Sequence, residues 1–458
     1  MVFFSSEGNR EFSYTYTITK MLTIPYICGI ILYFIMVMVL LFFLLVEKRK
    51  DMMQEKKEEK AGMTMKQYTK SFSLFLFLDV ALIGLNYLMH IMLSRLFQPT
   101  EYGVVGFYLA LLSVMFIIGL TVQYSTSRYV VEKKAEPLGA FYFLQLYVKR
   151  ILRGLIVLLF LLLWVVELDS ILVTSLLFLT IFLSHIVLCH KRGYLQGEKR
   201  FLSFSVSLYI ESAFKLFFIF CTIWWIREPN LILSAILAGQ LLSEYWTSKP
   251  AIIQYTYGYH YPKFLKDNYG VFYQQLFFHL IPAIDMITIH ILHPSLSGEY
   301  AIYQKYAQIL LFLGTSSLTF LFPFFVNKPT LTSLSQKSVL LIATLSGAIL
   351  LVYQWILPLS IPFLFGQQYG KGDSLLGVVA ASYLLFIFSQ TIVQSRIAQR
   401  HSGSTQLFFM GLLLYFMILI ISHSSMRSII IAHLGLNLYI FIALLIQQFR
   451  KERLYETV

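Results

Sequence analysis

The chain has 458 residues, of which 58% are hydrophobic and only 13% are charged, and its formal net charge is +13. The charged share is about half that of an average soluble protein, which excludes an ordinary soluble domain. The apolar residues come in runs of roughly 18 to 25, the length of a helix that crosses a hydrocarbon core of about 30 Å. The composition therefore predicts an all-α, multi-pass membrane protein.

The first apolar run, at about residues 21–46, is followed by a charged stretch at 47–70. We interpret this run as a retained helix and not as a signal peptide, because it is long and no small-residue cleavage site follows it. Twelve further spans are predicted near residues 71–93, 102–124, 141–163, 171–189, 203–226, 231–248, 271–292, 300–325, 338–357, 374–395, 406–422 and 427–449. Apolar run length thus predicts about 13 transmembrane helices.

Loops rich in Lys and Arg alternate strictly with loops that have at most one such residue. The rich set comprises residues 47–70, 125–153, 190–202, 249–270, 327–337, 396–401 and 450–453. Because basic loops stay on the cytoplasmic side of an inner membrane, we expect the N-terminus outside and the C-terminus inside. The positive net charge follows from this topology, and it requires no nucleic-acid partner.

A short internal repeat marks two halves of the chain. Residues 100–108 (TEYGVVGFY) resemble residues 298–306 (GEYAIYQKY), and residues 95–99 (RLFQP) parallel residues 290–294 (HILHP). Each copy lies between the first and second helix of a six-helix unit, and an even number of helices makes the two units parallel. We therefore predict two parallel six-helix bundles around a central cavity, plus one extra N-terminal helix.

This organisation assigns a role to each part of the chain. The predicted parts are an extracytoplasmic N-terminus with the extra helix (1–46), a charged cytoplasmic linker (47–70), the first bundle (71–248), a second cytoplasmic linker (249–270), the second bundle (271–449) and a cytoplasmic tail (450–458).

The segment LSRLFQPTEYGVVGFYLALLSVMFIIGL at 93–120 resembles the opening of polysaccharide flippases. Three later segments fit the same family in the same order: 192–201, 297–325 and 362–376. The family belongs to the multidrug, oligosaccharidyl-lipid and polysaccharide exporter superfamily, which also contains the lipid II flippases. The resemblance covers about residues 71–449. It implies that the chain flips an undecaprenyl-pyrophosphate-linked oligosaccharide by alternating access, and that membrane lipids, a polysaccharide polymerase and other assembly proteins are its partners.

A charged pyrophosphate needs cationic and hydrogen-bonding groups in a wet cavity, so ionisable residues inside spans are the candidates for its site. In span 71–93, Asp79, Asn86 and His90 lie within about 40° on one helix face. This stripe lines either the cavity or a packing contact between helices. Arg95 follows within LSRLF, a motif similar to that of a cavity-facing arginine in lipid II flippases. It either binds cargo or extends to the outer membrane surface.

The second half has its own set of polar candidates. His290 is the repeat counterpart of Arg95, and Asp285 is the counterpart of His90. Lys305 lies about a turn inside span 300–325, where we expect a phosphate contact or an ion pair with Asp285. The predicted cargo-binding residues are therefore Arg95, Lys305, His290, Asn86 and His90. Asp79 and Asp285 are the candidates for binding a coupling proton or sodium ion, because burial favours a protonated carboxyl group.

Glu211 and Lys215 stand four residues apart on span 203–226, with the glutamate first. That order and spacing favour an ion pair along the helix. We therefore predict that these two residues neutralise each other and have a structural role.

The sequence has no phosphate-binding loop, dinucleotide fingerprint or metal-binding His/Glu motif, so we expect no cofactor, no metal and no catalytic residue. Two alternatives to a polysaccharide flippase remain. A cation-coupled drug exporter of the same superfamily would have a smaller, less basic cavity. A membrane polymerase or ligase of sugar chains would need a large outer loop, whereas the longest one here is 358–373.

Overall fold

We describe the protein from a computed structural model. The residues that it describes are 65–132, 148–154, 170–223, 228–247, 261–327, 346–369, 375–398, 405–423 and 425–456. The chain divides into two compact units, Met1–Lys70 and Ser71–Val458, and the packing below is that of the second unit. The predicted helix at 21–46 lies outside the described residues.

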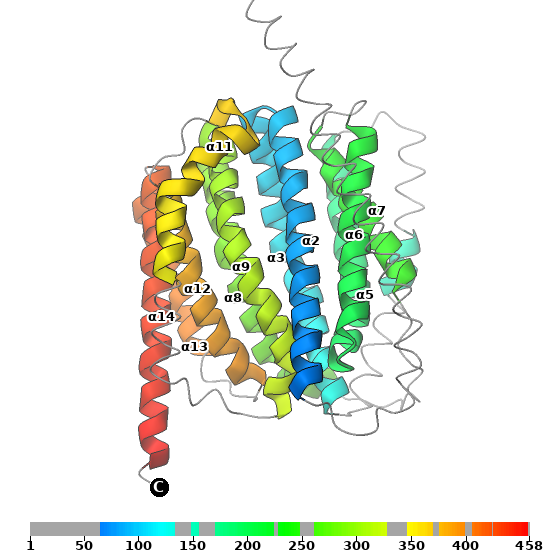
Figure 1. Ribbon diagram of the computed structural model, residues 1–458, viewed down its shortest axis with the longest axis vertical. Coiled ribbons are helices and arrows are strands. Elements are labelled where there is room, and N and C mark those ends of the chain that lie inside the picture. Colours follow the sequence, from blue (N-terminus) through cyan, green and yellow to red (C-terminus); the bar gives the residue numbers. More distant parts are fainter. Residues whose placement is uncertain are drawn as a thin grey trace, which may run out of the picture. The chain divides into compact units, whose positions relative to one another are not determined.

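Every regular element in the described ranges is helical. The N-terminal half contains α2 (Met65–Leu96), α3 (Pro99–Val131), α5 (Ser170–Gly197), α6 (Phe201–Thr222) and α7 (Asn230–Trp246). The C-terminal half contains α8 (Tyr261–Leu292), η1 (Pro294–Leu296), α9 (Ser297–Asn327), the π-helix η2 (Val352–Ile356), α11 (Leu357–Phe365), η3 (Gln367–Tyr369), α12 (Leu375–Ala398), α13 (Thr405–Ser422) and α14 (Met426–Glu456). The long helices run side by side (Figure 1).

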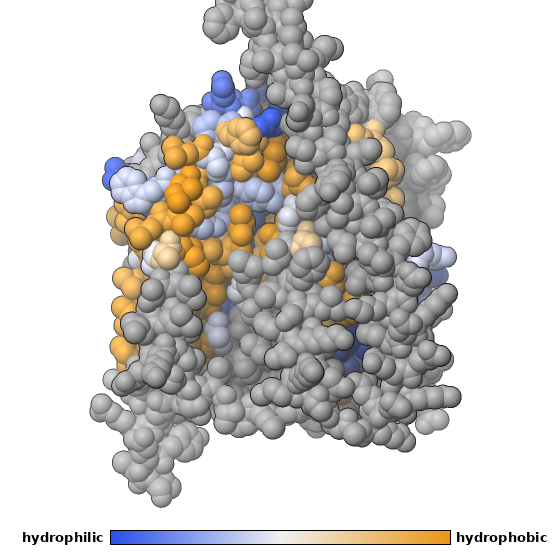
Figure 2. All heavy atoms as spheres, viewed as in Figure 1, coloured by the Kyte–Doolittle hydropathy of each residue, from blue (hydrophilic) through white to orange (hydrophobic). Residues whose placement is uncertain are grey.

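Seven helices in the described residues are long and apolar enough to cross a membrane. They are Pro99–Val131, Leu172–Gly197, Phe201–Thr222, Asn268–Leu292, Ser346–Phe365, Leu375–Val393 and Met426–Gln447. Large apolar side chains are exposed on α11, α13 and α14, among them Leu359, Phe363 and Ile421, each more than 75% exposed. Apolar residues, in orange, gather at the upper left of the view in Figure 2, where α11 lies in Figure 1. Lipid is the solvent in which such a surface is stable. The predicted class, an all-α multi-pass membrane protein, is confirmed, and the count of about 13 spans stays a prediction.

Helix α3 is the centre of the packing, since it contacts α5 from its own half and α8 and α9 from the other half. The contact is closest where the two repeat segments meet. A side chain at Gly103 would overlap the hydroxyl of Ser297, and one at Gly298 would overlap the carbonyl oxygen of Pro99. Glycine at these two positions therefore lets the backbones of the two halves approach each other.

Several helices continue past their apolar runs. Helix α5 was predicted to end near residue 189 but continues to Gly197, and Lys191 and Arg192 are buried in its last turns. The prediction was wrong because basic residues were taken to end the helix in water. Instead, Lys191 lies 3.5 Å from Glu244 and Arg192 lies 2.6 Å from Glu211, and such pairing is what allows charges to be buried.

Candidate functional site

Three groups that can bear positive charge come together from three helices. Lys305 of α9 and His90 of α2 are buried, and Lys215 of α6 is half-buried. The charges of the two lysines interact with each other, and both interact with His90. We call His90, Lys215 and Lys305 the cationic cluster. It includes residues of both halves of the chain, since α2 and α6 belong to the N-terminal half and α9 belongs to the C-terminal half.

Within the described residues, neither lysine lies within ion-pair distance of a carboxylate. Lys305 Nζ donates to Gln308 Oε1 at 2.9 Å, and Lys215 Nζ donates to Asn86 Oδ1 at 2.7 Å. His90 Nδ1 lies 3.2 Å from the hydroxyl of Tyr102. The hydrogen-bond partners of the cluster are thus neutral, and the Glu211 carboxylate acts on Lys215 only from beyond ion-pair distance.

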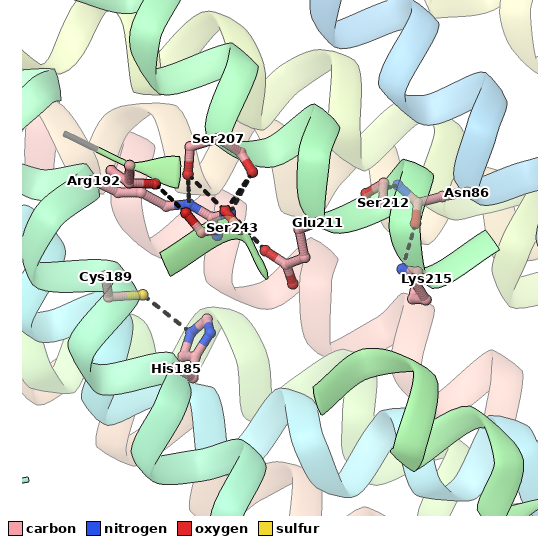
Figure 3. Close-up of polar contacts among 10 residues, drawn as sticks. Asn86, His185, Cys189, Arg192, Ser207, Glu211, Ser212, Lys215 and Ser243 are labelled. Atoms are coloured by element: carbon pink, nitrogen blue, oxygen red, sulfur yellow. Dashed lines mark hydrogen bonds and ion pairs between the residues drawn. The ribbon is translucent and has the colours of Figure 1, made fainter. Parts of the chain in front are cut away.

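Asn86 was predicted to contact cargo, and its amide has protein partners on both sides. Its oxygen accepts from Lys215, while its nitrogen donates to Ser212 Oγ at 3.3 Å and to the carbonyl oxygen of Leu82 at 3.1 Å (Figure 3). These donor bonds fix which end of the amide faces the lysine. The geometry makes Asn86 a positioning residue for Lys215.

The predicted ion pair between Glu211 and Lys215 is wrong. Glu211 Oε2 lies 2.6 Å from Arg192 Nη2, and this arginine also donates to Ser207 Oγ at 2.9 Å and Ser243 Oγ at 3.4 Å. In Figure 3, Glu211 points toward Arg192, and Lys215 points toward Asn86. A guanidinium with several donors competes for the carboxylate better than a flexible ammonium does. As a result, Lys215 bonds to Asn86 and not to Glu211.

Arg95 and His290 lie in the last turns of α2 and α8. Arg95 donates to the carbonyl oxygens of Phe363 and, at 2.8 Å, Leu364. His290 stacks on Phe107 with ring centroids 4.7 Å apart, and its Nδ1 lies 3.3 Å from Ser297 Oγ. Both residues therefore have partners of their own at these helix ends.

Asp285 is fully buried in the C-terminal half and pairs with His433 of α14 at 2.9 Å. Tyr300 donates to the same carboxylate oxygen at 3.3 Å. The alternative of an ion pair between Asp285 and Lys305 is thus wrong, because His433 occupies that role. Sequence reasoning missed His433, although an ionisable residue inside the apolar span 427–449 was a usable signal.

The surroundings of this carboxylate are polar. Ser382 Oγ lies 3.0 Å from His433 Nδ1, and Asn437 Nδ2 donates to Ser382 Oγ at 2.8 Å. Among the described residues, buried oxygens without a hydrogen-bond partner include Asp285 Oδ1, Asn437 Oδ1 and the hydroxyl of Tyr415 on α13, whose ring lies 6.1 Å from that of His433. Asp79, the other candidate for ion coupling, belongs to α2, but its side chain lies outside the described residues.

No protein-family model and no curated protein matches this sequence. Solved structures of transporters do match its fold. A MATE transporter in complex with MaL6 is 13% identical with a TM-score of 0.60, covering 85% of this chain and 97% of that one. An outward-facing multidrug resistance MATE family transporter of the MOP superfamily is also 13% identical, with a TM-score of 0.58, and the match covers 85% of this chain and 97% of that one.

A third match is a MOP superfamily transporter from Pyrococcus furiosus, described by the reverse polarity of its binding pocket, which suggests a different function. It is 14% identical with a TM-score of 0.59, covering 83% of this chain and 95% of that one. At sequence identities this low, the similarity shows a shared fold. The chain therefore has the fold of MATE transporters, with a cationic cluster between its two halves.

Proposed function

We propose that this protein is a flippase that moves an undecaprenyl-pyrophosphate-linked oligosaccharide across the inner membrane by alternating access, for surface polysaccharide synthesis. The cationic cluster is the observation that supports this proposal. Two lysines whose charges repel each other in a low-dielectric interior are costly unless an anion joins them. Each charge-assisted hydrogen bond to such an anion contributes about 1.5–3 kcal/mol.

The position of the two lysines supports a role for the anion in the transport cycle. Lys215 belongs to α6 of the N-terminal half, and Lys305 belongs to α9 of the C-terminal half. An anion between them attracts both halves, whereas the empty site repels them. We propose that pyrophosphate binding draws the halves together over the cargo, with Asn86 holding Lys215 in place. His90 is a further donor to the phosphate.

Arg95 and His290 were also predicted to bind cargo. The partners of Arg95 at the helix ends support a structural use of its side chain, and for His290 the cargo contact stays a prediction. We further propose that Asp285 binds the coupling ion, either a proton or sodium. A buried carboxylate that has one oxygen without a partner, next to the imidazole of His433, supports this choice.

The test replaces Lys215 or Lys305 with Gln in a strain that lacks its own copy of the gene. We expect loss of surface polysaccharide and accumulation of lipid-linked precursor on the cytoplasmic side, with normal protein level. Lys149→Gln is the matched control, because Lys149 lies 2.8 Å from Glu244, which keeps Lys191 as its other partner. Normal polysaccharide in both Gln variants contradicts the proposal.

The same variants separate the alternative, a cation-coupled multidrug exporter of this fold. The similarity in fold to a multidrug resistance MATE family transporter favours that alternative. It predicts changed drug tolerance and unchanged polysaccharide in the Lys215→Gln and Lys305→Gln strains. For the orientation, we propose the N-terminus outside and the C-terminus inside. A cysteine placed in 47–70 should then be protected from impermeant thiol reagents in intact cells, and one placed in 167–170 should react.

A further inference from the structure

Two helices from opposite halves of the chain end at the same place, α2 at Leu96 and α11 at Phe365. The last carbonyl oxygens of a helix have no partner within the helix and bear a negative partial charge. Those of α11 are approached from α2. Arg95 donates to the carbonyl oxygens of Phe363 and Leu364. Ser94 Oγ is 2.9 Å from the carbonyl oxygen of Ile91 and 3.3 Å from that of Phe365, and its hydroxyl can donate to either. The end of α11 is thus capped by the end of α2.

The capping is mutual. Gln368 Nε2 donates to the carbonyl oxygens of Ser94 at 2.7 Å and Phe97 at 3.1 Å, and the hydroxyl of Tyr369 donates to Ser94 at 3.2 Å. Burial raises the pKa of Tyr369, so its hydroxyl remains a donor. Gly366, with a φ of 114°, reverses the chain after α11 and brings these two side chains onto α2.

An aromatic layer connects these helix ends with the cationic cluster. The ring of Phe365 lies 5.5 Å from that of Tyr87 and 5.5 Å from that of Tyr306, and Tyr87 lies 5.8 Å from Tyr306. Tyr306 is the neighbour of Lys305 in the chain, and Tyr87 is three residues before His90. The end of α11 is therefore in contact with the residues that flank the site.

We propose that residues 94–97, at the end of α2, and residues 363–369, from the end of α11 through η3, form a latch that closes one end of the transport path, and that this latch must separate for cargo to leave. The role of the latch in cargo release rests on the proposed function. The bonds suit a reversible contact, because backbone carbonyls that lose Arg95 or Gln368 can be hydrated when the ends part. Arg95 is then a gating residue and not a cargo ligand.

The test is a distance measurement that needs no cargo. Spin labels are placed on cysteines at Glu228 and Ser425, two exposed positions in the connections that precede α7 and α14, in a cysteine-free full-length chain in nanodiscs. Arg95→Ala removes two charge-assisted bonds. We expect the ratio of closed to open populations to fall by at least about tenfold. For Arg95→Lys we expect a ratio between those of the parent protein and Arg95→Ala, since an ammonium does not reproduce the forked geometry of the guanidinium.

Two further variants make the result decisive. Gln368→Ala removes the bonds that run from η3 to the end of α2. We expect it to lower the ratio of closed to open populations by less than Arg95→Ala does. Arg427→Ala is the matched control, because Arg427 is an exposed arginine in the first turn of α14. An unchanged distance distribution in the double variant Arg95→Ala/Gln368→Ala overturns the latch. A shift in distance with normal surface polysaccharide keeps the latch and contradicts the proposed function instead.

Discussion

The ion pair between Arg192 and Glu211 allows a quantitative test of why Lys215 has no carboxylate partner. The side chain of Arg192 is 5% exposed and that of Glu211 is 17% exposed. Glu211→Ala leaves a buried guanidinium without its carboxylate, a loss that costs about 3–5 kcal/mol for buried pairs. Arg192 keeps its bonds to Ser207 and Ser243. We therefore expect a destabilisation near the lower limit, about 3 kcal/mol.

The assay is thermal unfolding of the purified protein in nanodiscs, followed by intrinsic fluorescence. The double variant Arg192→Met/Glu211→Leu should recover most of the lost stability, because an apolar pair of similar size has no charge to desolvate. Glu198→Ala is the control. Glu198 pairs with Arg200 at 3.2 Å, both side chains are 30% exposed, and its loss should cost less than about 1 kcal/mol.

Two results would refute this reasoning. The first is a Glu211→Ala variant as stable as Glu198→Ala, which would mean that the buried charge of Arg192 does not depend on Glu211. The second is a double variant no more stable than Glu211→Ala, which would mean that packing and not charge pairing accounts for the loss. The double variant should also retain export, since Lys215 keeps its bond to Asn86.

The remaining predictions concern the cluster and the contact between the halves. Asn86→Leu should lower export of surface polysaccharide. Asn86→Asp should lower export further, because a carboxylate 2.7 Å from Lys215 would neutralise the charge of the lysine. Export equal to that of the parent protein in Asn86→Asp would count against a cationic site. Gly298→Ala should lower thermal stability by about 1–3 kcal/mol, because the added methyl overlaps the backbone of Pro99. Gly435→Ala, where a Cβ has no neighbour within 4 Å, should instead gain about 0.5–1 kcal/mol.

The sequence alone determined that this chain is an all-helical, multi-pass membrane protein. Crossing a bilayer imposes a length and an apolar composition on each helix separately, so a single run such as 102–124 can be recognised without its neighbours. The repeat at 100–108 and 298–306 was equally visible. In the structure these two segments meet, since Gly103 abuts Ser297 and Gly298 abuts Pro99.

Only the tertiary structure decided how the charged residues are paired. Spacing on one helix paired Glu211 with Lys215, but a partner on another helix, Arg192, is closer and binds through a forked guanidinium. The same holds for Asp285, which pairs with His433 across nearly 150 residues of sequence rather than with Lys305. Helix periodicity describes contacts within about one turn, whereas ion pairs in a membrane interior form between helices. The sequence therefore shows which charged residues lie in apolar spans, and helix packing decides which of them pair with an opposite charge.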